Sequence, residues 1–177
     1  MAEAKPKVGL DYLNTADRAG FERSIGGLFE KNAWVAARTF DKRPFASLDN
    51  LYAAMTEVIF QASPAEKLEL IQSHPELVGR EAVSGTLSSQ SQQEQAKAGL
   101  TNLSPAEVAR FNDYNRAYRV RFGFPFIICA RKHHKSTILA AFPVRMQHSQ
   151  AEEIEIALDE ICQILEFRLK DAVESSR

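Results

Sequence analysis

The sequence predicts an all-α fold, a single-domain bundle of about eight helices. Apolar residues recur at spacings of three and four along most of the 177 residues, which is typical of helices packed on a core. Helix-start patterns recur along the chain. One strand-like segment, residues 122–130, has no second strand-like segment to pair with, so we expect an extended, buried connector there. We place the helical domain at residues 10–173, after a flexible tail of residues 1–9.

The helices follow from local signals taken in chain order. Asp17 and Ser47 are expected to cap two early helices. Three later starts carry a Ser with Glu three residues on, the capping-box pattern, at Ser63, Ser104 and Ser149. The last helix has an apolar stripe at spacings of three and four and is expected to face the core.

Composition excludes several classes of protein. A net charge of −1 gives no electrostatic reason to bind nucleic acid or an anionic membrane. No apolar run is long enough to span a bilayer, and no apolar signal segment is visible near Met1. Cys129 and Cys162 form no CxxC pair and lie in apolar stretches, which favours reduced core cysteines over a zinc site or a disulfide. We therefore expect a cytoplasmic protein.

His74 is the first candidate for chemistry, because it stands directly before Pro75. A residue before proline is disfavoured in the α region, so the helix should stop there and the imidazole should project from its end. One interpretation is a histidine that caps the helix and favours its dipole. The other is a catalytic group that titrates near neutrality.

Two further segments carry candidate polar groups. Ser91 and Glu94 fit another capping box, but with Gln95 they also share one helix face and could grip a polar ligand. Arg145 precedes the last helix. It is either a surface charge or a guanidinium that holds a carboxylate or urea-like group bidentately. Phosphate loops, nucleophile elbows and HExxH motifs are absent from the sequence.

Taken together, these segments resemble the 2-oxo-4-hydroxy-4-carboxy-5-ureidoimidazoline (OHCU) decarboxylase family. The resemblance runs from about Leu10 to Leu169. The segments that carry it are Leu13-Asn14, Phe29-Glu30, Trp34-Val35-Ala36, Arg43-Pro44-Phe45, His74-Pro75-Glu76-Leu77-Val78-Gly79, Ser91 with Glu94-Gln95, Ala98-Gly99-Leu100, Asn115-Arg116-Ala117-Tyr118 and Arg121–Ile128. The chain departs from the family's pattern at Met146 and His148, where a leucine and an asparagine are usual, and at Pro143, which interrupts the approach to Arg145.

The resemblance implies an all-helical enzyme, often a homodimer, that uses no metal and no organic cofactor. It also implies that the enzyme converts OHCU to (S)-allantoin in urate degradation. That activity would be coupled functionally to uricase and hydroxyisourate hydrolase. The resemblance places catalysis on His74, Glu94 and Arg145. It places substrate binding on Pro75, Ser91, Gln95 and the connector, namely Phe124, Phe126, Ile127, Ile128 and Cys129.

Two other functions remain open from the residues alone. A non-catalytic helical binding or regulatory module would use His74 as a cap and Ser91 with Glu94 as a capping box. A metal-dependent hydrolase would use His74, Glu94 and His148 as ligands.

Overall fold

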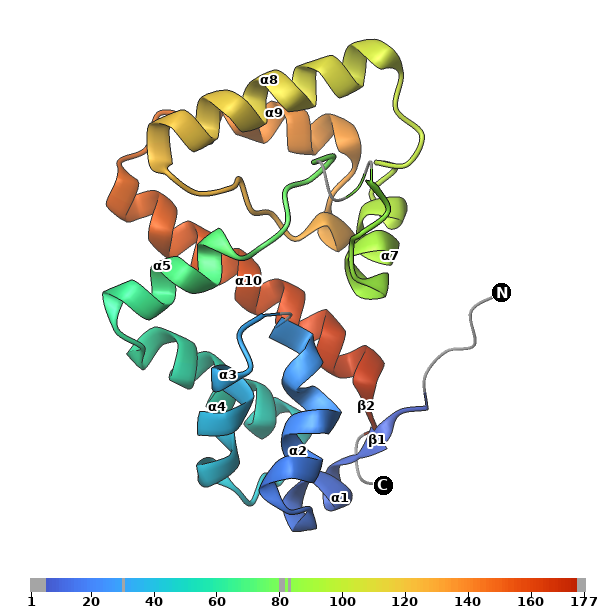
Figure 1. Cartoon of the computed structure of the whole chain (residues 1–177), viewed down its shortest axis with the longest axis vertical. Helices are drawn as coiled ribbons and strands as arrows, with labels where there is room; N and C mark the ends of the chain where they lie inside the picture. Colours follow the sequence, from blue (N-terminus) through green and yellow to red (C-terminus); the bar gives the residue numbers. More distant parts are fainter. Residues whose placement is uncertain (1–5, 30, 80–81, 83, 175–177) are drawn as a thin grey trace. The chain divides into compact units, whose positions relative to one another are not determined.

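The prediction of an all-α fold is confirmed by the computed structural model, which consists mainly of helices (Figure 1). The structure describes residues 6–29, 31–79, 82 and 84–174. Within this part of the chain it has nine α-helices, where about eight were expected. The chain folds into two compact units, Met1–Ser63 with Cys162–Arg177, and Pro64–Ile161.

The first unit contains four short helices and the C-terminal part of the last one. These are α1 (Leu10–Thr15), α2 (Arg18–Ile25), α3 (Trp34–Thr39), α4 (Leu48–Gln61) and residues 162–172 of α10 (Gln150–Ala172). Both predicted caps are confirmed. Gly20 N donates to Asp17 Oδ1 at 2.7 Å, and Asn50 N donates to Ser47 Oγ at 3.1 Å. Each bond satisfies an amide that the first helical turn leaves unpaired.

The first unit also holds a small parallel sheet that the sequence did not predict. Strand β1 (Val8–Gly9) pairs with β2 (Val173–Glu174). The predicted flexible tail of residues 1–9 is therefore wrong at Val8 and Gly9, while residues 1–5 lie outside the described part of the chain. Two-residue strands are too short to show an alternating pattern, so sequence periodicity could not reveal them.

The second unit contains the candidate residues. Its helices are α5 (Pro64–Gln72), α7 (Ser89–Lys97), α8 (Pro105–Phe122), α9 (Lys135–Arg145) and residues 150–161 of α10. Helices α8 and α9 lie side by side (Figure 1). Two of the predicted capping boxes are confirmed here. Ser104 and Glu107 exchange side-chain and backbone bonds, and so do Ser149 and Glu152.

The predicted connector is extended and buried, as expected. Helix α8 ends at Phe122, and Gly123 follows it with a left-handed φ of 80°. All residues from Phe124 to Cys129 are buried, and a short 3₁₀ helix (Ala130–Lys132) follows. Phe126 stacks on Phe142 of α9 with ring centroids 3.8 Å apart. These side chains belong to the aromatic core of the unit, so the connector can offer a ligand mainly its backbone.

Within the described residues, no helix combines the length and the apolar character that crossing a membrane requires.

Candidate active site

His74 lies where the sequence placed it, just beyond the end of α5. The helix closes at Gln72, and His74 N donates to Ile71 O at 3.2 Å in the final turn. Pro75 follows and lies outside the helix. Both residues are half-buried. The predicted helix stop is confirmed, and it leaves the imidazole at a junction rather than along a helix face.

Helix α7 decides between the two interpretations of Ser91 and Glu94. The N-cap is Ser88, whose Oγ accepts a hydrogen bond from Ser91 N at 3.2 Å. The capping-box interpretation is therefore wrong, because Ser91 is already in the first helical turn. Ser91, Glu94 and Gln95 are all buried, with 3%, 9% and 6% of their surface exposed. Three polar side chains thus face the interior of the second unit, where a polar group needs a partner.

The loop that follows His74 is attached to this face. Gln95 Oε1 accepts from Val78 N at 3.1 Å, and Gln95 Nε2 donates to Glu76 O at 3.4 Å. From α8, Asn115 Nδ2 donates to Leu77 O at 2.8 Å. These bonds hold the backbone of three consecutive residues, Glu76 and Val78 to α7 and Leu77 to α8. As a result, the His74-Pro75 junction is tied to the helix that carries Glu94.

The connector closes the third side of the site. Gln72 Nε2, at the end of α5, donates to Gly123 O at 3.2 Å, at the start of the connector. At its other end, burial and the carboxylates of Glu160 and Glu94 raise the pKa of the Cys129 thiol to about 11, against the opposing charge of Lys132. The 3₁₀ helix that directly follows Cys129 packs against α7, the helix that carries Glu94. The loop, the α7 face and the connector converge within the second unit.

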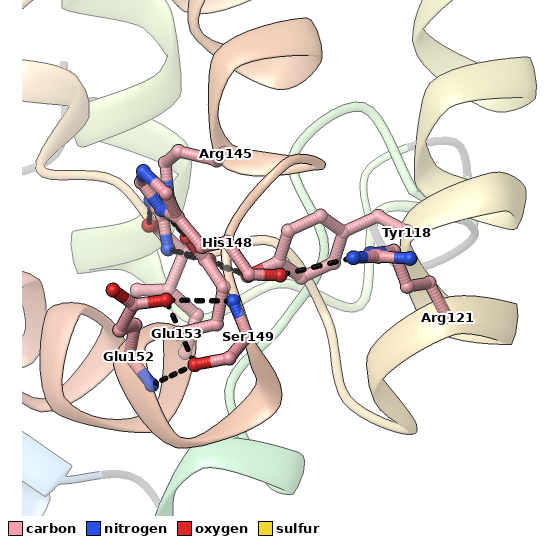
Figure 2. Close-up of polar contacts among 8 residues, drawn as sticks. Tyr118, Arg121, Arg145, His148, Ser149, Glu152 and Glu153 are labelled. Atoms are coloured by element: carbon pink, nitrogen blue, oxygen red, sulfur yellow. Dashed lines mark hydrogen bonds and ion pairs between the residues drawn. The ribbon is translucent and has the colours of Figure 1, made fainter.

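Arg145 occupies a different kind of environment, a polar cluster that Figure 2 draws together with the exposed residues Arg121, Ser149 and Glu152. It is the last residue of α9 and is 7% exposed. Its guanidinium donates to Glu153 through Nε at 2.9 Å and through Nη2 at 2.7 Å. It also donates to Tyr118 Oη at 3.3 Å and to the carbonyl of Ile127. Arg145 is thus linked to the site through the connector, because Ile127 lies in it.

Glu153 is the centre of this cluster and was missed by sequence reasoning. It is fully buried, at 0% exposure, and accepts from Arg145, from Tyr118 Oη and from His148 Nδ1 at 2.7 Å. Burial opposes its ionisation, but these hydrogen bonds outweigh burial and hold the pKa of Glu153 below its ordinary value. In the sequence it is one of two acids in the first turn of α10, where acids commonly favour the helix dipole. No local signal separates it from Glu152.

His148, at which the chain departs from the family's pattern, belongs to this cluster, because its Nδ1 pairs with Glu153 Oε1. Among the described residues, no group of three or more His, Cys, Asp or Glu side chains is placed to hold a metal ion.

A second buried arginine was not singled out from the sequence. Arg168, in the first unit, is 2% exposed and donates to Leu28 O at 2.9 Å. It follows Leu165 by three residues, so it shares the apolar face of α10. That spacing was the signal that could have found it.

Comparison with known proteins decides the family. A sequence profile described as OHCU decarboxylase matches residues 14–170, which is most of the chain. The chain belongs to the OHCU decarboxylase family.

Individual relatives agree with this assignment. The chain is similar to the 2-oxo-4-hydroxy-4-carboxy-5-ureidoimidazoline decarboxylase of Halalkalicoccus jeotgali, with 38% identity over 93% of this chain and 92% of the relative. It is also similar to a uric acid degradation bifunctional protein of Bacillus subtilis, with 36% identity over 93% of this chain and 32% of the longer protein. Among solved structures, an (S)-allantoin synthase superposes with a TM-score of 0.74 at 30% identity. That match covers 94% of this chain and 54% of the other.

In this member of the OHCU decarboxylase family, three of the motifs that carry the resemblance lie in the second unit. The Ser-x-x-Glu-Gln motif forms a buried face, the His-Pro motif forms the adjoining junction, and the phenylalanine-rich motif forms the extended connector. The three motifs are separate in the sequence, and the fold of the second unit brings them together.

Proposed function

We propose that this protein catalyses the decarboxylation of OHCU to (S)-allantoin, a step of urate degradation, and that it is a carboxy-lyase. The observation that carries the proposal is the buried face of Ser91, Glu94 and Gln95 against the His74 loop, in a chain that belongs to the OHCU decarboxylase family. A polar face turned into a protein interior costs free energy unless it serves a ligand or a structural network.

The substrate contains its own electron sink. OHCU carries a hydroxyl and a carboxylate on one ring carbon, next to a C=N bond. When the bond to the carboxylate breaks, its electron pair forms a C=C bond and the C=N pair moves to nitrogen, which takes up a proton. The hydroxyl then loses its proton and becomes a carbonyl, while the neighbouring carbon takes up a proton. No cofactor is needed to accept the electrons.

His74 and Glu94 are the groups we assign to the proton transfers. A histidine suits proton exchange near neutral pH, and general acid–base catalysis contributes roughly 10²–10⁴-fold. We assign to His74 the exchange with the substrate hydroxyl or ring, and to Glu94 the role of its partner. Pro75, Ser91 and Gln95 would line the site. The connector backbone from Phe124 to Cys129 would bind the ring and ureido amides.

Arg145 requires a modified assignment. The resemblance implied an arginine that steers the anionic substrate, but the bonds from Arg145 to Glu153, Tyr118 and Ile127 O engage all three of its nitrogens. We therefore propose that Arg145 supports catalysis by holding the connector through Ile127 O. Arg168 is the other arginine among the buried polar residues described, so it is the necessary comparison.

The wider setting is proposed on the same basis. We propose that residues 10–173 act as one catalytic domain and that the protein works in the cytoplasm as a homodimer. Functional coupling to uricase and hydroxyisourate hydrolase is supported by the bifunctional relative, in which a segment similar to this chain is part of a uric acid degradation protein.

The test generates the unstable substrate in place. Urate is treated with uricase and hydroxyisourate hydrolase, the protein is added, and circular dichroism follows the product. Rapid appearance of one allantoin enantiomer is expected. Slow formation of racemic allantoin at the uncatalysed rate would refute the proposal and favour a non-catalytic module.

Variants assign the roles. His74→Gln and Glu94→Gln are each expected to lower kcat by about 10²-fold or more. His133→Gln and Glu155→Gln are matched controls, because Glu155 is exposed and His133 lies outside the three converging segments. Arg145→Lys and Arg168→Lys, compared at equal folded fraction, show which arginine affects KM for the anionic substrate. Near-normal turnover by folded His74→Gln protein would show that His74 is not the proton carrier.

A further inference from the structure

Two unfavourable features lie close together in the loop that follows His74. Val78 has a left-handed φ of 55°, which is strained for a β-branched residue. Asn115, whose Nδ2 donates to Leu77 O, is 5% exposed, and its Oδ1 is a buried oxygen without a hydrogen-bond partner among the described residues. Both features cost stability. Costs of this kind persist where the surrounding structure imposes a particular geometry, and they concentrate at functional sites.

The surrounding bonds show which geometry is imposed. Val78 N is bound by Gln95 Oε1 at 3.1 Å, and Leu77 O is bound by Asn115 Nδ2 at 2.8 Å. One partner comes from α7 and the other from α8, so the loop is held from two helices. These anchors begin three residues after His74, and the proline between leaves the chain little freedom to absorb a shift.

A further contact to the loop is of a different kind. Arg119, one turn beyond Asn115 on α8, pairs with the side chain of Glu76 at 2.7 Å. The arginine side chain is 50% exposed, and such a pair contributes little to stability. Arg119 binds the side chain of Glu76, whereas Asn115 binds a backbone carbonyl of the loop. Asn115 is therefore the residue of α8 whose bond reaches the backbone of the loop.

We propose that Asn115 is a positioning residue for His74: its bond to Leu77 O holds the strained turn at Val78 and thereby sets the His74 imidazole against the α7 face that carries Glu94. Asn115 does not touch the substrate in this role. Its kinetic consequences rest on the proposed decarboxylation, whereas its effect on the His74 ring does not.

The first test observes the ring itself. The chain has four histidines, so the ring signals of His74 can be assigned in a ¹H–¹³C spectrum by their loss in His74→Gln. Asn115→Ala is expected to shift or broaden the His74 signals and to leave those of His134 unchanged. Asn112→Ala is the matched control, because Asn112 is an exposed asparagine on the same helix. Unchanged His74 signals in folded Asn115→Ala protein would overturn the proposal, whether or not the protein is active.

The second test measures turnover. Asn115→Ala is expected to lower kcat by at least tenfold while KM changes less than threefold, because the binding groups stay in place. Arg119→Ala and Asn112→Ala are expected to keep kcat within twofold of the wild type. A kcat for Asn115→Ala equal to that of Asn112→Ala would contradict the positioning role.

A variant of Val78 covers the case in which Asn115→Ala fails to fold. Glycine adopts the left-handed φ without strain, so Val78→Gly is expected to fold. Its backbone is also less restricted than that of valine, so the turn is held less firmly. We expect the His74 signals to broaden and kcat to fall in Val78→Gly. If both match the wild type, the strained turn does not position His74.

Discussion

Val78 and Gln95 are joined by a hydrogen bond of 3.1 Å from the Val78 amide to Gln95 Oε1. The bond connects the strained turn after His74 to the residue that follows Glu94 in α7. His74 and Glu94, the proposed proton-transfer pair, are therefore connected within the second unit through the loop backbone and the side chain of Gln95. The buried cluster and the connector beside this pair have consequences that can be measured.

Breaking the buried pair of Arg145 and Glu153 should destabilise the protein strongly. Arg145→Met leaves the Glu153 carboxylate, fully buried, with two partners instead of three. Removing one member of a buried ion pair typically costs about 3–5 kcal/mol, and we expect about 3 here because Tyr118 and His148 remain. Urea unfolding measures the change. The exposed Arg116→Met is the control, with an expected effect of about 0.5 kcal/mol or less. Equal losses for the two variants would contradict this prediction.

The pH dependence of stability should show the lowered pKa of Glu153. Its folded pKa lies below the ordinary value of 4.5, so the unfolded state binds the proton more readily. The stability that its ionised form contributes is complete above about pH 4.5 and is lost as the pH falls through the folded pKa. Unfolding midpoints measured from pH 6 to pH 2.5 should therefore fall less steeply for Glu153→Gln than for the wild type. A parallel fall would show that Glu153 is not the coupled group.

Gly123 should resist substitution because of its backbone conformation. Its φ of 80° terminates α8, and a Cβ added there meets no atom within 4 Å. The expected cost of Gly123→Ala, about 1 kcal/mol, is therefore backbone strain alone. Gly27→Ala is the matched control, since Gly27 also has space for a Cβ but no positive φ. Thermal unfolding should separate the two variants, and an equal response would contradict the strain argument.

The thiol of Cys129 should be unreactive in the folded protein. It is fully buried, and its pKa is raised to about 11, so little thiolate forms near neutral pH. Cys162 is also buried. We expect no rapid reaction with a thiol reagent at pH 7.5 and modification of both cysteines after unfolding in urea. A fast-reacting thiol that disappears in Cys129→Ala would contradict the buried position of the connector.

Much of the fold could be predicted because its signals are local. The caps at Asp17, Ser47 and Ser104 involve partners three residues away, which the sequence displays directly. The same holds for the stop at His74, which depends on the proline that follows it. The connector could be recognised because its apolar run is continuous and interrupts the helical spacing of apolar residues at the end of α8.

Other features depend on contacts between distant residues, and no local pattern encodes those. The local pattern at Ser91 fits a helix cap, but in the structure Ser91 is buried together with Glu94. The resemblance implied a substrate-binding role for Arg145, but in the structure its guanidinium donates hydrogen bonds to Glu153, Tyr118 and Ile127 O. Asn115 and Leu77 are 38 residues apart in the sequence, yet their bond lies in the interior. The helices and the His74 junction could thus be predicted from the amino-acid order, whereas packing alone decided which polar groups face the site and which serve the protein itself.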